Sequence, residues 1–146
     1  MKIAIVKLSA LGDIVHAMVA LQFIKAAYPQ AEIDWIVEQR FAELLANNPE
    51  INQVLTVNFK GLKTQKSGVW GEIEKIKAYA HRSYDLVIDA QGLIKSAVVA
   101  RLLSKHCAGF DKHSIRESAA AWLYKTTVAC PDAENPLVFE LRRIKK

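Results

Sequence analysis

Short apolar runs alternate with helical patterns along the 146-residue chain. The runs are rich in β-branched residues, as is typical of strands buried on both faces of a parallel sheet, and they cover residues 3–6, 33–37, 54–57, 86–88 and 107–110. Apolar residues at helical spacing predict helices at 13–28, 41–47, 73–80, 94–104, 117–124 and 135–146. The alternation predicts one α/β domain over residues 1–146, a Rossmann-like parallel sheet with helices on both faces.

Two loops of this predicted sheet are expected to face each other. With the strand order 3-2-1-4-5, the order reverses between the first and the fourth strand, and ligands of such sheets bind beyond the carboxyl ends of the strands at this point. The loops that follow these two strands are residues 8–13 and 89–95. Both are rich in small and polar side chains, so they define the expected crevice.

The first loop offers a candidate general base and a candidate anion site. Asp13 stands where the loop meets the first predicted helix, and there it either caps the helix or accepts a proton at the mouth of the crevice. The N–H groups of a helix start stabilise a carboxylate and weaken it as a base, so the two roles compete. His16, one turn later, either orients Asp13 or packs. Gly12 allows close approach of a ligand to the helix N-terminus, where anions bind.

The second loop and a basic stretch offer further polar groups. Gln91 and Lys95 are candidates for holding polar or phosphate oxygens, although the segment could equally supply only turn and helix-start chemistry. Residues 58–71 hold three glycines and few apolar residues, together with Lys60, Lys63 and Lys66. We expect a mobile basic loop here, which is either an anion-binding patch or simply solvated.

Composition and missing motifs exclude several classes of protein. The formal net charge of +5 favours anionic partners, but no aromatic residues are interleaved with the lysines of the basic stretch, which disfavours nucleic acid. Neither G-x-G-x-x-G nor the P-loop motif occurs, which disfavours a nucleotide-dependent oxidoreductase. Cys107 and Cys130 match no metal motif and are expected to be reduced thiols, one disulfide being the alternative. We expect no signal peptide and no membrane-spanning segment.

Four blocks of the sequence together resemble the lipopolysaccharide heptosyltransferases of glycosyltransferase family 9, and among them the type I enzymes. The blocks are residues 1–16, residues 34–38 with Phe41, residues 84–96, and residues 109–111 with 114–117. The resemblance implies the acceptor-binding N-terminal domain of a GT-B glycosyltransferase. It further implies metal-independent, inverting transfer of heptose from ADP-heptose to Kdo of Kdo2-lipid A, with no cofactor other than this donor substrate.

The same resemblance assigns roles to individual residues. Asp13 matches the catalytic base of the family, and Ser9 and Gly12 match its neighbours in the active-site loop. Lys60 and Lys63 fall near the basic acceptor-binding loop. The full expected acceptor site consists of Ser9, Gly12, Lys60, Lys63, Gln91, Lys95 and Arg116, the last matching an arginine that contacts acceptor phosphate or carboxylate.

Family members are considerably longer, and their second domain holds the ADP-heptose site, so we expect that domain to be absent from this chain. We expect a cytoplasmic protein peripherally associated with the inner membrane, where its lipid acceptor lies. Two alternatives stay open. One is a transferase of heptosyltransferase type II or III, and the other is a non-catalytic module that binds an anionic glycolipid.

Overall fold

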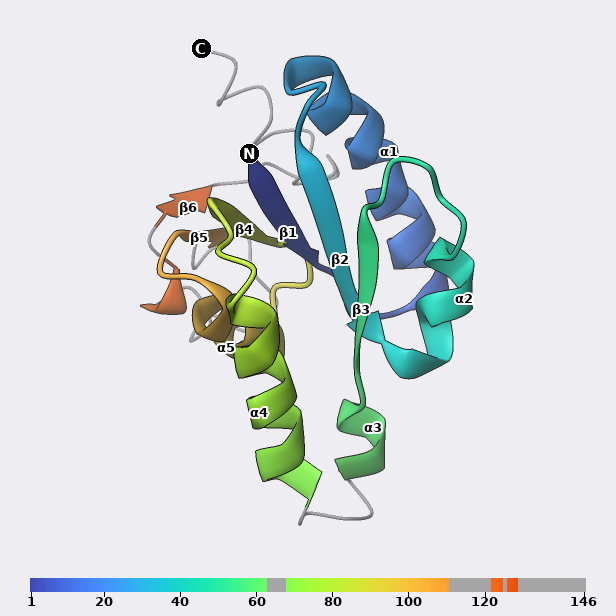
Figure 1. Cartoon of the computed structure of the whole chain (residues 1–146). Coiled ribbons are helices and arrows are strands. Elements are labelled where there is room, and N and C mark those ends of the chain that lie inside the picture. The colour runs from blue at the N-terminus through green and yellow to red at the C-terminus, as the bar shows by residue number, and fades with distance from the viewer. Residues whose placement is uncertain (63–67, 111–121, 125, 129–146) are drawn as a thin grey trace.

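The centre of the molecule is a six-stranded sheet in which all neighbouring strands are parallel (Figure 1). The structure is a computed structural model, and it describes residues 1–62, 68–110, 122–124 and 126–128. The strands are β1 (Lys2–Val6), β2 (Glu32–Glu38), β3 (Gln53–Val57), β4 (Leu86–Asp89), β5 (Cys107–Phe110) and β6 (Thr126–Val128). Their order, β3-β2-β1-β4-β5-β6, confirms the predicted 3-2-1-4-5 arrangement. The sequence pattern did not predict β6, because a strand of three residues is too short to show a period.

Helices cover both faces of the sheet. They are α1 (Leu11–Ala27), the 3₁₀ turn η1 (Gln39–Phe41), α2 (Ala42–Leu45), α3 (Phe59–Leu62), α4 (Val69–Ala80) and α5 (Ile94–Leu103). Side chains of α1 and α2 pack into one buried cluster, and side chains of α4 and α5 pack into the other. The two pairs of helices lie on opposite faces of the sheet (Figure 1). Residues 122–124 are the only described part of the helix predicted at 117–124, and the helix predicted at 135–146 lies outside the described residues.

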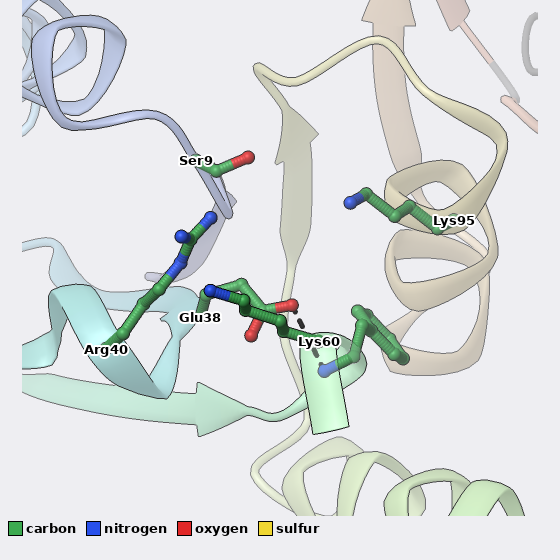
Figure 2. Close-up of a pocket in the computed structure, with 6 residues that line it drawn as sticks. Ser9, Glu38, Arg40, Lys60 and Lys95 are labelled. Atoms are coloured by element: carbon green, nitrogen blue, oxygen red, sulfur yellow. Dashed lines mark hydrogen bonds between the residues drawn. The ribbon is translucent and has the colours of Figure 1, made fainter. Parts of the chain in front are cut away.

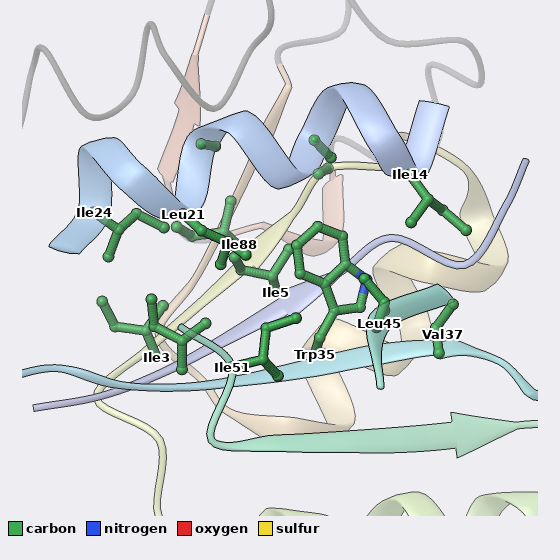
Figure 3. Packing of buried hydrophobic residues seen from close by; sticks show 14 of the residues in the cluster. Ile3, Ile5, Ile14, Leu21, Ile24, Trp35, Val37, Leu45, Ile51 and Ile88 are labelled. Atoms are coloured by element: carbon green, nitrogen blue, oxygen red, sulfur yellow. The ribbon is translucent and has the colours of Figure 1, made fainter. Parts of the chain in front are cut away.

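Alternating strand residues supply the two cores. In β1, Ile3 and Ile5 belong to the cluster beneath α1, whereas Ala4 and Val6 belong to the cluster beneath α5. Trp35 of β2 has 0% of its surface exposed and lies in the α1-side cluster beneath the helix (Figure 3). Each fully buried aliphatic side chain stabilises the fold by about 1.5–3 kcal/mol relative to exposure. These two cores fix the strand register. The register in turn sets where the loops at the carboxyl edge of the sheet begin.

Two expectations about local structure are wrong. Helix α1 begins at Leu11, its N-cap is Ala10, and no side chain caps it, so Asp13 is not the capping residue. Asp13 lies instead in the first helical turn, where a negative charge still interacts favourably with the helix dipole. The basic stretch is not loop throughout, since α3 begins at Phe59. The reason is local: the Asn58 side-chain oxygen accepts the N–H of Gly61 at 3.0 Å, which satisfies a donor of the short helix.

The expected crevice loops do lie side by side. Val6 at the end of β1 pairs with Asp89 at the end of β4, so the chain leaves both strands at the same edge. The Ala90 N–H donates to the Val6 carbonyl at 3.0 Å, and Lys7 Nζ donates to the Ala90 carbonyl at 3.2 Å. The loop that leads to α1 and the loop that leads to α5 are therefore tied together. Within the described ranges, no helix is long and apolar enough to cross a membrane.

Candidate functional site

A small polar pocket lies at the carboxyl edge of the sheet (Figure 2). Its volume is about 220 Å³, and it is lined by Ser9, Glu38, Arg40, Phe59, Lys60 and Lys95. These residues come from the loop after β1, the end of β2 with η1, the start of α3 and the first turn of α5. Three cations and one carboxylate thus converge from three of these four segments, which is a lining suited to an anionic ligand that also carries hydrogen-bonding groups.

The cations of the pocket are exposed, whereas Glu38 is largely buried. Arg40, Lys60 and Lys95 are exposed, and the Arg40 guanidinium stacks over the Phe41 ring with its carbon 4.5 Å from the ring centroid. Glu38 is only 4% exposed. Burial raises the pKa of Glu38 above its usual range, and the opposing influences are a hydrogen bond from a backbone N–H and the nearby charges of Lys95 and Arg40.

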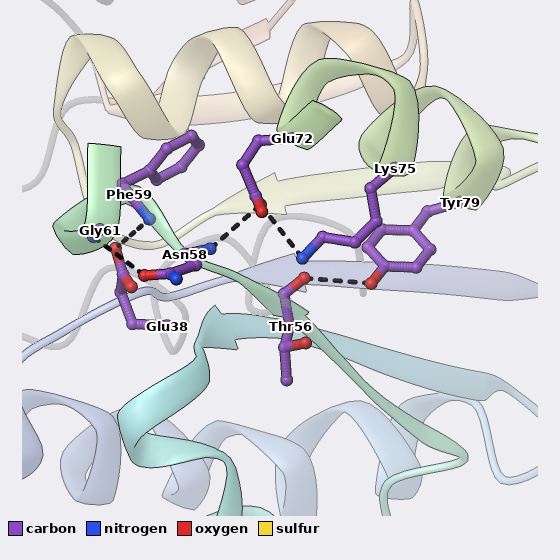
Figure 4. A network of polar contacts seen from close by, with 8 residues as sticks. All are labelled: Glu38, Thr56, Asn58, Phe59, Gly61, Glu72, Lys75 and Tyr79. Atoms are coloured by element: carbon purple, nitrogen blue, oxygen red, sulfur yellow. Dashed lines mark hydrogen bonds and ion pairs between the residues drawn. The ribbon is translucent and has the colours of Figure 1, made fainter. Parts of the chain in front are cut away.

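A network of polar contacts holds Asn58 and Phe59, the two residues before Lys60 (Figure 4). Glu38 Oε1 accepts the N–H of Phe59 at 3.1 Å, and Glu72 Oε2 accepts the N–H of Asn58 at 3.0 Å. Glu72 also forms an ion pair with Lys75 at 3.1 Å. Carboxylates from β2 and α4 therefore hold the turn that precedes Lys60 from two sides, so this lysine starts from a fixed backbone although its side chain is exposed.

The loop after β4 is organised by Asp89. This residue is 2% exposed, and its Oδ1 accepts the N–H groups of Gln91 at 2.8 Å and of Gly92 at 3.3 Å. Its Oδ2 accepts the Ser96 hydroxyl at 2.8 Å and the Tyr124 hydroxyl. Burial raises the pKa of Asp89, and these four donors oppose that shift. Asp89 therefore organises the turn that follows β4.

The structure brings together three of the residues singled out from sequence: Ser9, Lys60 and Lys95 line one pocket. Gln91 does not line it, since it is 5% exposed and its side-chain oxygen accepts N–H groups of the neighbouring loop. Gly12 and Asp13 are exposed at the start of α1. A Cβ built at Gly12 would meet no atom within 4 Å, so packing within the chain does not require glycine there. Lys63 and Arg116 lie outside the described residues.

Sequence reasoning missed Glu38 and Arg40. One signal was present, because Glu38 is a charged residue that closes an apolar strand, at the edge where ligands of parallel sheets bind. No sequence pattern pointed to Arg40, because it lies in a 3₁₀ turn of three residues, which is too short to show a hydrophobic period. Among the described residues, no group of three or more His, Cys, Asp or Glu side chains could hold a metal ion.

Comparisons with known proteins give a consistent result. Residues 74–144 match the model of glycosyltransferase family 9 (heptosyltransferase). Lipopolysaccharide heptosyltransferase 1 of Campylobacter coli is 40% identical over 138 residues, which is 94% of this chain and 39% of the relative. The Escherichia coli K12 protein of the same name is 34% identical over 129 residues, or 85% of this chain and 40% of the relative. The chain therefore spans about two-fifths of the length of these curated relatives.

Solved structures show the same fold. The E. coli heptosyltransferase WaaC with ADP superposes with a TM-score of 0.86 and 30% identity, over 99% of this chain and 46% of that one. A family 9 glycosyltransferase of Veillonella parvula superposes with a TM-score of 0.77 at 16% identity, over 99% of this chain and 41% of that one, which shows the fold alone.

The parallel sheet with helices on both faces is that of a Rossmann-like half of a GT-B glycosyltransferase. The chain belongs to glycosyltransferase family 9, the heptosyltransferases.

Proposed function

We propose that this chain is the acceptor-binding half of an enzyme that transfers heptose from ADP-heptose to a Kdo residue of Kdo2-lipid A. The observation that carries the proposal is the pocket in which Arg40, Lys60 and Lys95 surround a space of about 220 Å³ at the carboxyl edge of the sheet. Kdo is a sugar acid and lipid A bears phosphates, so three cations match the charge of the acceptor. The names of the relatives and the TM-score of 0.86 to WaaC support the same assignment.

In this proposal the acceptor lies along the edge of the sheet. Arg40, Lys60 and Lys95 neutralise its anionic groups, and the Ser9 hydroxyl and the Glu38 carboxylate hydrogen-bond its sugar. Gly12 leaves room at the start of α1, where an oxygen of the ligand can approach the backbone. Lys63 and Arg116 are assigned to the acceptor from the family resemblance alone.

We assign the general base to Asp13. A hydroxyl oxygen of the acceptor attacks the anomeric carbon of the heptose, the bond from that carbon to the ADP oxygen breaks, and the configuration inverts. The hydroxyl proton passes to the Asp13 carboxylate, and ADP leaves with the bonding electrons. Asp13 is exposed in the first turn of α1, four residues after pocket-lining Ser9, so a bound acceptor can reach it. Structures of the E. coli relative are described with ADP and with an ADP-heptose analogue, which supports ADP-heptose as the donor.

The proposal includes the setting of the reaction. No metal ion takes part in the chemistry assigned here, and the domain of residues 1–146 supplies only the acceptor side. The protein acts in the cytoplasm at the surface of the inner membrane, to which it binds peripherally through its lipid acceptor and its net charge of +5.

The test is a transfer assay with ADP-heptose and Kdo2-lipid A. An enzyme that carries this chain together with a donor-binding half should form heptosylated Kdo2-lipid A, and it should do so in the presence of EDTA. The 146-residue chain alone should form none. Turnover by the isolated chain would contradict the assignment to one half. Transfer to a heptosylated acceptor instead of to Kdo would favour a heptosyltransferase of type II or III.

A further inference from the structure

Gln91 connects the two loops at the carboxyl edge of the sheet. It is 5% exposed and follows β4, yet its side-chain oxygen accepts the N–H groups of Leu8 and Ser9, both at 3.2 Å, in the loop after β1. One carboxamide oxygen therefore satisfies two consecutive backbone donors. Because two N–H groups require an acceptor, chemistry fixes which end of the amide faces the loop.

The hydrogen bonds of the Gln91 side chain go to the backbone of the loop after β1. Within the ranges that the structure describes, no residue accepts a hydrogen bond from the Gln91 Nε2 group. The two N–H groups of the loop therefore account for the orientation of the Gln91 amide. The backbone of Gln91 is in turn held by Asp89, whose Oδ1 accepts its N–H at 2.8 Å.

The loop that Gln91 holds leads directly to the residues assigned to catalysis. Its opposite side is fixed by β2, because the Leu8 carbonyl accepts the N–H of Glu38 at 3.2 Å. Ser9 lines the pocket, and α1 with Asp13 begins two residues later. A displacement of the Leu8 and Ser9 amides would therefore move the Ser9 hydroxyl and the first turn of α1 relative to the cations of the pocket.

We propose that Gln91 is a positioning residue whose side-chain oxygen holds the loop after β1, so that Ser9 and Asp13 are presented to the ligand of the pocket. This role rests on the proposed function, and it replaces the direct contact with acceptor oxygens that the sequence suggested for Gln91. Gln91 acts through the loop and does not itself touch the acceptor.

Three variants of the chain test this role. Gln91→Met keeps the side-chain length and removes the amide oxygen, whereas Gln91→Glu keeps an oxygen acceptor and removes the NH₂ group. Ser96→Ala is the matched control, because it removes a buried hydroxyl that bonds Asp89 and Leu93, whereas the loop after β1 takes its hydrogen bonds from Gln91. For each folded variant, amide hydrogen exchange of Leu8 and Ser9 is compared with that of β1 by NMR, and the affinity for Kdo monosaccharide is measured by titration.

Gln91→Met should accelerate exchange at Leu8 and Ser9 by about tenfold relative to β1 and weaken Kdo binding by about tenfold, as expected for the loss of local hydrogen bonds. Gln91→Glu should retain the exchange rates, and in high salt, where its added negative charge is screened, it should bind Kdo as well as the unmodified chain does at the same salt concentration. Ser96→Ala should lower the melting temperature while leaving both unchanged. Weaker Kdo binding by Gln91→Glu that persists in high salt would mean that the NH₂ group contacts the ligand, which would overturn the positioning role. Unchanged Kdo binding in Gln91→Met would overturn it too. Absence of Kdo binding by the unmodified chain would instead overturn the proposed function.

Discussion

Replacement of Glu38 by Gln changes the charge of the pocket with little change of shape. Glu38 is the one carboxylate among the described pocket-lining residues, beside Arg40, Lys60 and Lys95. The formal charge of these four residues is +2, and the variant raises it to +3. The Gln side-chain oxygen can still accept the Phe59 N–H that Glu38 accepts at 3.1 Å, so α3 and Lys60 should stay in place.

Removal of the negative charge should increase the affinity of the pocket for anions. A unit charge about 8 Å from a bound anion, at an effective dielectric constant of about 20, contributes about 2 kcal/mol. Salt at physiological ionic strength, with a Debye length of about 8 Å, reduces this to about 1 kcal/mol. The variant should therefore bind inorganic phosphate about fivefold more tightly than the unmodified chain.

The assay is calorimetric titration of phosphate at low and at physiological salt. Glu43→Gln is the control, because Glu43 is an exposed glutamate of α2 outside the pocket lining. The reasoning is refuted if Glu38→Gln binds phosphate no better than the unmodified chain, or if Glu43→Gln gives the same gain.

The same substitution should change how stability depends on pH. Burial raises the pKa of Glu38 above 4.5, so the folded state holds its proton more strongly than the unfolded chain does. Its contribution to stability is complete below the unfolded pKa and is lost as pH rises through the raised folded pKa. The free energy of unfolding should therefore fall less between pH 4.5 and 8 in Glu38→Gln than in the unmodified chain, as urea unfolding at several pH values would show. An identical pH dependence would contradict the burial of this charge.

The remaining predictions concern Asp13, the cations and the core. In an enzyme with both halves, Asp13→Asn should lower kcat by about 10²–10⁴-fold with only a small fall in melting temperature from the lost interaction with the helix dipole, and near-normal kcat would rule out the base. Lys60→Ala with Lys95→Ala should weaken Kdo binding and flatten its dependence on salt; an unchanged salt slope would mean that these lysines are merely solvated. Leu21→Ala, at a core position with 0% exposure, should cost about 2–5 kcal/mol in urea unfolding, and a loss below about 1 kcal/mol would contradict the packing.

Hydrophobic patterns predicted the sheet because its strands are buried on both faces. The runs at Ile3, Ile33 and Ile88 belong to strands that pack against helices on either side, so their composition alone identified them. The order of strands then placed the crevice. The first turn of α1 was misjudged, because Asp13 is a favoured capping residue and nothing in the local sequence shows that Ala10 begins the helix instead.

The pocket was only partly predictable, for a physical reason. Lys60 and Lys95 stand out in the sequence as cations near loops. Glu38 and Arg40 lie at and just after the carboxyl end of β2, and only the folded sheet brings this end close to the two lysines. Gln91 was noticed as a polar residue in the right loop. Its hydrogen bonds to Leu8 and Ser9 span more than eighty residues of sequence, and no periodicity encodes such a pairing.

The proposed function gives this chain the acceptor side of a heptosyltransferase. The most direct measurement is a pair of calorimetric titrations of the isolated chain, one with the Kdo2 headgroup released from Kdo2-lipid A and one with ADP-heptose. We expect saturable binding of the Kdo2 headgroup that weakens with salt, and no binding of ADP-heptose. Binding of ADP-heptose with no response to the Kdo2 headgroup would contradict it.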